Sequence, residues 1–274
     1  MSKKILFILS EYGYWGEELV GPLAACDEQG YQIVFATPNG KRPVPLPPSI
    51  DPGYIDPPLG RSVTTPEVAA SVVELDGSGR LDEPVSLSEW VPERPYNSEN
   101  NFLRKIEAYY RELDDVAEDL RSFDAMVIVG GSGPIVDLAN NGRVHELILA
   151  FVRAGKPIVA ECYGVACLAF ARDWEDRASI IDGKHVTGHC KEYDYKDGTG
   201  FIGVEFNMGP PPYPLEYILR DATGPTGRYH ANVGHETSVI VDYPFITARS
   251  TPDSFLAGEK LVEVLESGLT RYGW

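Results

Sequence analysis

The sequence predicts a flavodoxin-like α/β fold: a doubly wound, mostly parallel sheet with helices on both faces and a proline-rich insertion. Two observations predict it. Short apolar runs, typical of strands buried on both faces, alternate with amphipathic stretches of helical period. Glycine turns follow several of these runs, at the points where strands pass into their connecting helices. Such connections cross over the sheet and make the strands parallel.

The first unit is a strand, a helix and a second strand. The apolar run over residues 3–9 predicts the first strand. Residues 16–29 repeat apolar side chains at helical spacing, and Gly30 supplies the stop. Residues 31–37 predict the second strand, which ends at a Pro-Asn-Gly turn. This order predicts a parallel βαβ beginning.

A proline-rich segment then interrupts the pattern. We treat residues 41–100 as an insertion within a single domain of residues 1–274. Proline has no N–H to donate, so this segment cannot supply a central strand. Its apolar residues are compatible with an ordered excursion that caps a site, and its length with a partly mobile loop. The sequence leaves both interpretations open.

After the insertion the alternation resumes. Helices are predicted over residues 101–122, from Pro134, and over residues 144–155, 163–172 and 254–269. Strands are predicted over residues 125–129 and 156–161, with a strand and turn over 183–190 and a hairpin over 237–250. These elements complete one α/β domain.

Composition narrows the class of protein. The net charge of −17 disfavours nucleic acid or an anionic membrane as a partner, because phosphate would be repelled. No apolar run of about 18 residues is present to predict a membrane span. The N-terminal run lacks a cleavage site, so we expect a cytoplasmic protein with reduced cysteines. Their spacing contains no CxxC pair, and we expect neither a metal site nor a redox dithiol.

The stretch "IVAECYGVA", residues 158–166, carries the clearest chemical signal. A buried strand ends at Cys162, and a tight turn leads into a helix. Such an elbow lifts its side chain off the sheet and faces it with N–H groups at the helix start. These groups favour the thiolate, so we expect Cys162 to have a lowered pKa, of roughly 4–7. The N–H of Tyr163 would lie beside a developing oxyanion.

Two further segments are expected at the same edge of the sheet. Gly130 and Gly131 end one strand, and Glu17 and Glu18 follow another. The carboxyl ends of parallel strands meet at one edge, where open α/β sheets bind ligands. We therefore expect the two glycines to bring backbone N–H groups to the substrate, and one of the two glutamates to face Cys162.

The chain resembles the DJ-1/PfpI superfamily of class I glutamine amidotransferase-like proteins. The resemblance lies in "YWGEELVGP", "FDAMVIVGGSGPIVDLANN", "GKPIVAECYGVACL" and "SVIVDYPFITARSTPDS", and is greatest to the Hsp31-like branch of glyoxalase III-type enzymes and chaperones. It implies that Glu18, four residues before Pro22, contacts Cys162, with Glu17 as the alternative. It also implies that Gly131 is the oxyanion-side glycine and that the protein is a homodimer.

One position departs from that branch. Its enzymes have histidine directly after the nucleophile, whereas this chain has Tyr163, so a triad cannot be completed there. The candidate substitutes are His189, His230 and His235. His189 follows the "VTG" strand and is expected to point inward, whereas His185 is expected to face solvent.

The sequence also leaves open which acidic residue pairs with the histidine and what role the other cysteines have. Glu192 or Asp194 could take the acidic position. Cys26 and Cys167 lie on apolar helix faces and are expected in the core, whereas Cys190 has no clear place. The substrate walls are expected from the insertion and from residues 190–235.

The sequence thus favours a cofactor-free cysteine enzyme that acts on a small electrophile such as a carbonyl, amide or nitrile compound. In this hypothesis Cys162 attacks, protonated Glu18 shuttles the proton, and Tyr163 orients the substrate. The reaction is glyoxalase III-like or that of a hydrolase or hydratase. The alternative is an Hsp31-like stress protein, a redox sensor or holdase, in which Cys162 is oxidised rather than catalytic. A glutaminase-type amidase ranks low, because His235-Glu236 lacks the usual spacing.

Overall fold

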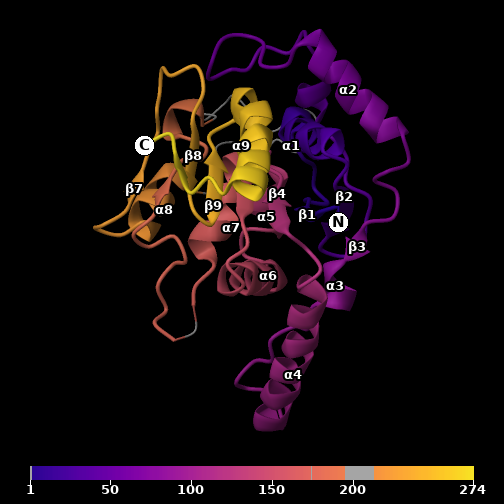
Figure 1. Ribbon diagram of the computed structural model, residues 1–274, viewed down its shortest axis with the longest axis vertical. Helices are drawn as coiled ribbons and strands as arrows, with labels where there is room; N and C mark the ends of the chain where they lie inside the picture. The colour runs from indigo at the N-terminus through magenta and orange to yellow at the C-terminus, as the bar shows by residue number, and fades with distance from the viewer. Residues whose placement is uncertain (1, 174, 195–212) are drawn as a thin grey trace.

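The computed structural model describes residues 2–173, 175–194 and 213–274 of the chain. Its centre is a sheet with the strand order β10-β8-β9-β5-β4-β1-β2-β3 (Figure 1). The strands are β1 (Lys4–Ile8), β2 (Gln32–Thr37), β3 (Val85–Ser86), β4 (Ala125–Ile128), β5 (Ile158–Glu161), β8 (Val239–Asp242), β9 (Phe245–Ala248) and β10 (Arg271–Tyr272). A separate pair joins β6 (His185–Val186) to β7 (Arg228–Tyr229).

The sheet is parallel from β3 to β9. The pairs β2–β3, β1–β2, β1–β4, β4–β5 and β5–β9 all run in the same direction. Only β8 and β10 at the far edge are antiparallel to their neighbours. This arrangement confirms the predicted mostly parallel sheet. Its consequence for the site is that β1, β4, β5 and β9 deliver their carboxyl ends to one edge.

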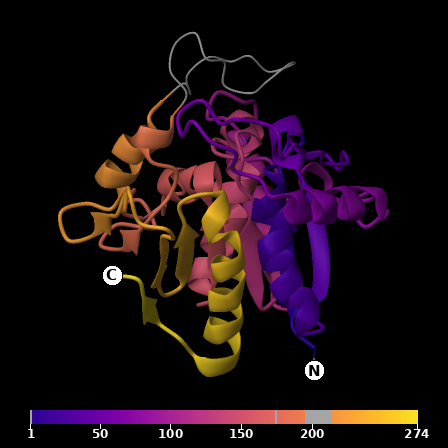
Figure 2. The same cartoon turned by 90° about the horizontal axis from the view of Figure 1, so that it is seen from above.

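Helices cover both faces of the sheet, as the doubly wound prediction requires. They are α1 (Gly16–Glu28), α2 (Pro66–Gly77), α3 (Leu87–Trp90), α4 (Phe102–Leu120), α5 (Gly133–Asp137), α6 (Gly142–Arg153), α7 (Val165–Phe170), α8 (Leu215–Ala222) and α9 (Ser254–Ser267). Helices α1 and α9 run side by side on one face (Figures 1 and 2).

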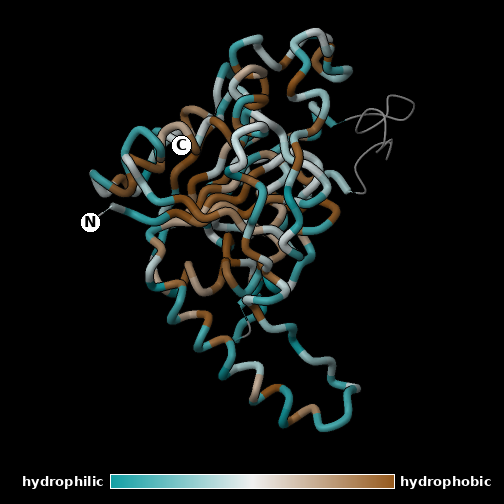
Figure 3. Tube along the Cα trace, turned by 90° about the vertical axis from the view of Figure 1, so that its right-hand side faces the viewer, coloured by the Kyte–Doolittle hydropathy of each residue, from teal (hydrophilic) through white to brown (hydrophobic). Residues whose placement is uncertain are grey.

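Alternation along the strands divides the core into two layers. In β1, Ile5 and Phe7 pack with the apolar faces of α1, α2 and α9, whereas Leu6 and Ile8 pack on the opposite side with α6 and α7. Successive side chains of a strand point to opposite faces, so a run that is apolar throughout needs a cover on each side. The hydrophobic centre and its more polar surroundings are visible in Figure 3.

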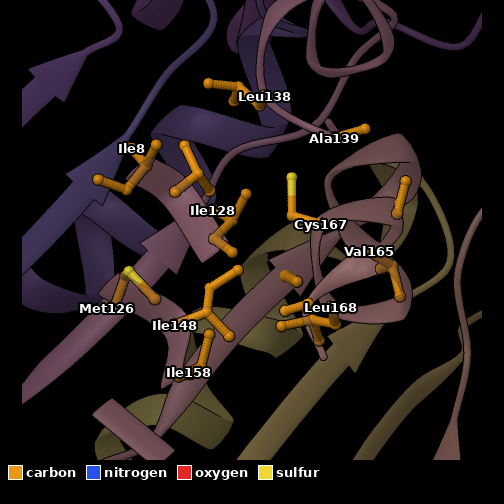
Figure 4. Packing of buried hydrophobic residues seen from close by; sticks show 14 of the residues in the cluster. Ile8, Met126, Ile128, Leu138, Ala139, Ile148, Ile158, Val165, Cys167 and Leu168 are labelled. Carbon is orange, nitrogen blue, oxygen red and sulfur yellow. The ribbon is translucent and has the colours of Figure 1, made fainter. Parts of the chain in front are cut away.

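Cys167 lies inside the second of these layers, as expected. It packs among Ile128, Val165 and Leu168, and none of its surface is exposed (Figure 4). Cys26 is equally buried on the α1 side of the sheet. Both positions match the expectation of core cysteines.

The proline-rich segment contains regular structure. It includes a short 3₁₀ turn, Pro47–Ile50, together with α2, β3 and α3. The N-cap of α2 is Thr65, whose hydroxyl accepts from the N–H of Val68. The segment is followed by α4, which projects away from the rest of the molecule (Figure 1). These elements are compatible with the ordered excursion, which stays a prediction.

Candidate active site

Cys162 sits at a sharp corner between β5 and α7. The strand ends at Glu161, a 3₁₀ turn follows over Cys162–Gly164, and the helix begins at Val165. Cys162 has a φ of 50°. A non-glycine residue in this left-handed region costs about 1–3 kcal/mol, and such strain gathers at functional sites. The structure thus has the nucleophile elbow that the sequence predicts.

The glycine turn after β4 lies against this corner. Gly131 has a φ of 88°, and its N–H, together with that of Tyr163, faces the Cys162 thiol and acts to lower its pKa. A Cβ on Gly130 would lie 2.2 Å from Oε2 of Glu18 and 2.4 Å from the carbonyl oxygen of Glu161. Gly131 therefore contributes a donor, whereas Gly130 packs behind the pair of side chains and does not line the cavity.

Glu18 reaches the same point from the first turn of α1. Its side chain is 2% exposed and contacts both the Cys162 thiol and the Gly131 N–H. Burial raises the pKa of Glu18 to about 8, and the charges of Glu17 and Asp253 add to this. The carboxyl group therefore keeps its proton at neutral pH and can donate to sulfur.

The prediction of a lowered pKa for Cys162 is wrong. Burial raises the pKa of Cys162 well above its usual value, and the nearby Glu18 carboxylate raises it further. The N–H groups of Gly131 and Tyr163 act in the opposite direction but do not outweigh burial. The side chain is only 6% exposed, so water does little to stabilise a thiolate. The residue is therefore a neutral thiol, which would need a base to become a nucleophile.

His189 is the base within reach. Its Nδ1 lies 3.5 Å from Sγ of Cys162, and its Nε2 lies 3.2 Å from Oδ1 of Asp194. The Nε2 is not aligned for a hydrogen bond to that oxygen, so the contact is an ion-pair distance only. Of the candidate histidines and acids, the structure thus brings together His189 and Asp194 beside Cys162.

Tyr163 supports this pair. Its ring stacks on His189 with centroids 4.2 Å apart, and its hydroxyl donates a 2.8 Å hydrogen bond to Oδ1 of Asp194. The hydroxyl is thus engaged with Asp194, while the backbone N–H faces sulfur and the side chain lines the cavity. The substrate contact expected of Tyr163 stays a prediction.

Backbone contacts hold the segment that carries His189 against the elbow. The N–H of His189 donates to the carbonyl of Cys162 at 3.4 Å, and that of Thr187 donates to Oγ1 of Thr247 on β9 at 2.9 Å. A Cβ at Gly188 would lie 2.9 Å from Leu219 and 3.2 Å from Val165. Glycine at this position therefore allows the chain to approach α7 closely enough to present the imidazole.

A cluster of buried carboxyl groups lies behind the cysteine. Glu161 is 0% exposed, and neither of its oxygens has a hydrogen-bond partner among the described residues; the hydroxyl of Ser254 is near but misaligned. Burial raises the pKa of Glu161 well above its usual value and raises those of Glu17 and Asp253 to about 6. Glu17, the alternative partner expected for Cys162, is half-buried and accepts from the hydroxyl of Thr251.

The candidate site opens into a cavity of about 720 Å³. The predicted site residues that line it are Cys162, Glu17, Glu18, Gly131, Tyr163 and His189. The insertion supplies much of the remaining wall, and His235 and Tyr193 come from the expected range of residues 190–235. Residues 195–212 of that range lie outside the described residues. A thiol beside a base in a cavity of this size can attack an electrophilic carbon.

The other candidates lie elsewhere or are only peripheral. His235 lines the cavity but is exposed. His230 lies outside it and pairs with His185, whose Nδ1 is 2.8 Å from its Nε2. The expectation that His185 faces solvent is wrong, because its ring is half-buried and stacks on Trp274. Cys190 is buried and does not line the cavity.

Sequence analysis missed Arg249. It follows β9, lines the cavity and is 1% exposed. Its guanidinium donates to the carbonyls of Asn232, His235 and Glu236, so it holds the loop that carries His235. The sequence could have predicted it, because Arg249 is a charged residue at the end of an apolar strand. Ligand sites in open α/β sheets lie at the carboxyl ends of strands, the rule that also applies to Cys162.

Across residues 2–173, 175–194 and 213–274, no three His, Cys, Asp or Glu side chains are grouped so as to hold a metal ion. Within the same ranges, every helix is too short or too polar to cross a bilayer.

Comparisons with known proteins place the chain among relatives. A model of ThiJ/PfpI family-like proteins matches residues 9–198. Glutamine amidotransferase-like class 1 domain-containing protein 1 of Bos taurus is 26% identical over 182 residues, covering 66% of this chain and 73% of that protein. Protein/nucleic acid deglycase HchA of Pseudomonas aeruginosa is 23% identical over 212 residues, covering 72% and 68%.

Solved structures show the same fold. Rapid Encystment Protein 24 KDa of Francisella tularensis aligns with a TM-score of 0.64 at 20% identity, covering 96% of this chain and 99% of that one. Glyoxalase III of Candida albicans aligns with a TM-score of 0.61 at 16% identity, covering 97% and 98%. The match of the family model over most of the chain, together with this shared fold, shows that the chain belongs to the ThiJ/PfpI-like family within the DJ-1/PfpI superfamily.

Proposed function

We propose that this protein is a cofactor-free cysteine enzyme that acts on a small electrophilic compound, with Cys162 as nucleophile, His189 as base and Asp194 as its partner. The observation that carries the proposal is the 3.5 Å contact between Sγ of Cys162 and Nδ1 of His189 inside a cavity. A neutral buried thiol next to an imidazole is the arrangement in which a base activates a nucleophile.

The first step is common to carbonyl, amide and nitrile substrates. As Sγ bonds to the electrophilic carbon, its proton passes to Nδ1 of His189, and the π electrons of the substrate move onto oxygen or nitrogen. The N–H groups of Gly131 and Tyr163, which face sulfur, lie beside the charge that develops. Asp194 stabilises the imidazolium at Nε2. Glu18, protonated at neutral pH, adds no charge beside the reacting atoms.

Relatives support a reaction of the glyoxalase III or hydrolase type. Two similar proteins are named as a protein/nucleic acid deglycase and a glyoxalase III. The alternative, a redox-sensing stress protein, is less well supported, because oxidation favours exposed thiolates and Cys162 is a buried thiol with a raised pKa. Cytoplasmic location and a homodimer remain predictions from the sequence.

The test is turnover of methylglyoxal, acetamide and a simple nitrile by four proteins: wild type, Cys162→Ser, His189→Ala and Cys167→Ala. We expect Cys162→Ser to abolish turnover and His189→Ala to reduce kcat by about 10²–10⁴-fold. Cys167→Ala, a core change away from the cavity, should retain kcat per folded molecule. Turnover that survives in Cys162→Ser, or is absent from wild type with all three compounds, would contradict the proposal.

A further inference from the structure

The cavity is far larger than the smallest electrophiles require. Its volume of about 720 Å³ is in the range of pockets that enclose drug-sized ligands. Liquid water takes about 30 Å³ per molecule, so the space corresponds to roughly two dozen waters. A three-carbon dicarbonyl would leave most of it filled with solvent. The walls around the sulfur, moreover, come from several segments of the chain.

The insertion makes part of the wall apolar. Leu46, Pro48, Leu59 and Val63 all line the cavity, and they come from the proline-rich segment. Trp15, just before α1, adds an aromatic face. Side chains of this kind gain by covering an apolar part of a ligand, because both surfaces leave water. Nothing in the attack by Cys162 on a carbon atom needs such a wall.

Carboxyl groups outnumber arginines in the wall. Glu17, Glu18, Asp56 and Glu236 line the cavity, and all but Glu18, which keeps its proton at neutral pH, can carry charge there. The two arginines are Arg61, which is exposed, and Arg249, which is already engaged with the carbonyls of residues 232, 235 and 236 and with Asp253. The net charge of the whole chain is −17. A negatively charged ligand would therefore be repelled on approach and on binding.

We propose that the cavity selects uncharged electrophiles with an apolar, ring-sized body, which the insertion and Trp15 cover while Cys162 attacks the reactive carbon. This substrate class rests on the proposed function of Cys162. It assigns the insertion a role in specificity: Leu59 and Val63 are specificity-determining residues, and Glu17 disfavours carboxylate substrates.

The test uses alkylation of Cys162, which needs an accessible sulfur but no turnover. Sγ displaces iodide from the CH₂ group of each reagent, and the thiol proton is lost to the base. The reagents are iodoacetamide, its N-benzyl derivative, and iodoacetate, which differ in apolar body and charge. Rates at Cys162 are read by peptide mass spectrometry and divided by the rates of glutathione with the same reagents. The other cysteines, all fully buried, serve as internal references.

We expect the corrected rate for the N-benzyl reagent to exceed that of iodoacetamide by at least about tenfold, from burial of the ring. Iodoacetate should fall below iodoacetamide by a similar factor. Leu59→Ser and Val63→Ser should each reduce the benzyl preference, whereas Val73→Ser, on the exposed side of α2 and 54% exposed, should not. Glu17→Gln should raise the iodoacetate rate, and Glu118→Gln on α4 should not.

Two outcomes separate this inference from the proposed function. Selective alkylation of Cys162 with no turnover of any compound would contradict the proposed enzymatic function but support the inferred selectivity of the cavity. Corrected rates that are equal for the three reagents in the wild-type protein, or no reaction at Cys162, would overturn the inference, and this measurement does not depend on any variant folding. With turnover present, phenylglyoxal should exceed methylglyoxal in kcat/KM by the same factor.

Discussion

The hydroxyl of Tyr163 donates a 2.8 Å hydrogen bond to Oδ1 of Asp194, and the tyrosine ring stacks on His189. One side chain thus fixes both partners of the candidate nucleophile. The residue that displaces the expected histidine after Cys162 holds a different histidine in place. This explains how the departure at position 163 is compatible with a thiol that needs a base.

Tyr163→Phe tests this positioning role. The change removes the hydrogen bond to Asp194 and keeps the stacked ring. Hydrogen bonds to charged groups contribute about 1.5–3 kcal/mol, so we expect kcat/KM to fall by about ten- to a hundredfold. The pH profile of kcat/KM should also shift, because Asp194 orients the base. Tyr110→Phe, on the exposed part of α4, is the matched control. An unchanged pH profile would leave Tyr163 with a packing role only.

Glu18→Gln should make the thiol more acidic. The Glu18 carboxylate raises the pKa of Cys162, and its own pKa is raised to about 8, so it is charged in the range where the thiol titrates. Removing that charge should lower the apparent pKa of Cys162, measured from the iodoacetamide rate against pH. Glu263→Gln, on α9 and partly exposed, should leave the profile unchanged. A rise in the apparent pKa would show that Glu18 stabilises the thiolate.

The carboxyl cluster predicts how stability depends on pH. Glu18, Glu17 and Asp253 have pKa values raised to about 8, 6 and 6 in the folded protein. For an acid of raised pKa the folded state binds more protons than the unfolded state. The stabilisation that each group contributes to folding is therefore complete below its pKa in the unfolded state, and it is lost as pH rises towards its pKa in the folded state. We expect the free energy of unfolding to fall between about pH 4.5 and 8, by up to about 1.4 kcal/mol per pH unit for each group.

Glu161→Gln isolates one member of the cluster. Glu161 has no hydrogen-bond partner among the described residues, and its pKa is raised well above the usual value. The amide cannot ionise, so the variant should lose less stability than wild type as pH rises. Urea unfolding midpoints at a series of pH values measure this, with Glu118→Gln as the control. Parallel curves for wild type and Glu161→Gln would mean that Glu161 is not titrating in this range.

Gly130→Ala tests the close approach of the glycine turn to the elbow. Its new methyl group would meet Oε2 of Glu18 at 2.2 Å and the carbonyl oxygen of Glu161 at 2.4 Å. Overpacking typically costs 1–3 kcal/mol, so we expect a loss of about that size and slower alkylation of Cys162. Gly142→Ala, where nothing lies within 4 Å, should be neutral or stabilising by thermal unfolding. Equal midpoints for the two variants would contradict this packing.

The sequence by itself determined the central elements and the elbow. Continuous apolar runs in β1 and β4 and helical spacing in α1 and α9 are local patterns, and each is readable within a short window. The strand–turn–helix at Cys162 is equally local. The convergence of Glu18 and Gly131 on that cysteine followed from a general rule, that parallel strands end at one edge.

Only the tertiary structure decided which histidine lies beside the thiol. His189 lies 27 residues after Cys162, and its approach depends on β6, on Gly188 and on backbone bonds to the elbow, none of which has a local pattern. The direction in which the pKa of Cys162 shifts depends on burial, which is a property of the whole packed molecule. The lowered pKa expected from the elbow alone was therefore wrong. The sequence likewise did not determine which residues of the insertion line the cavity, because a proline-rich segment has no periodicity that places its side chains.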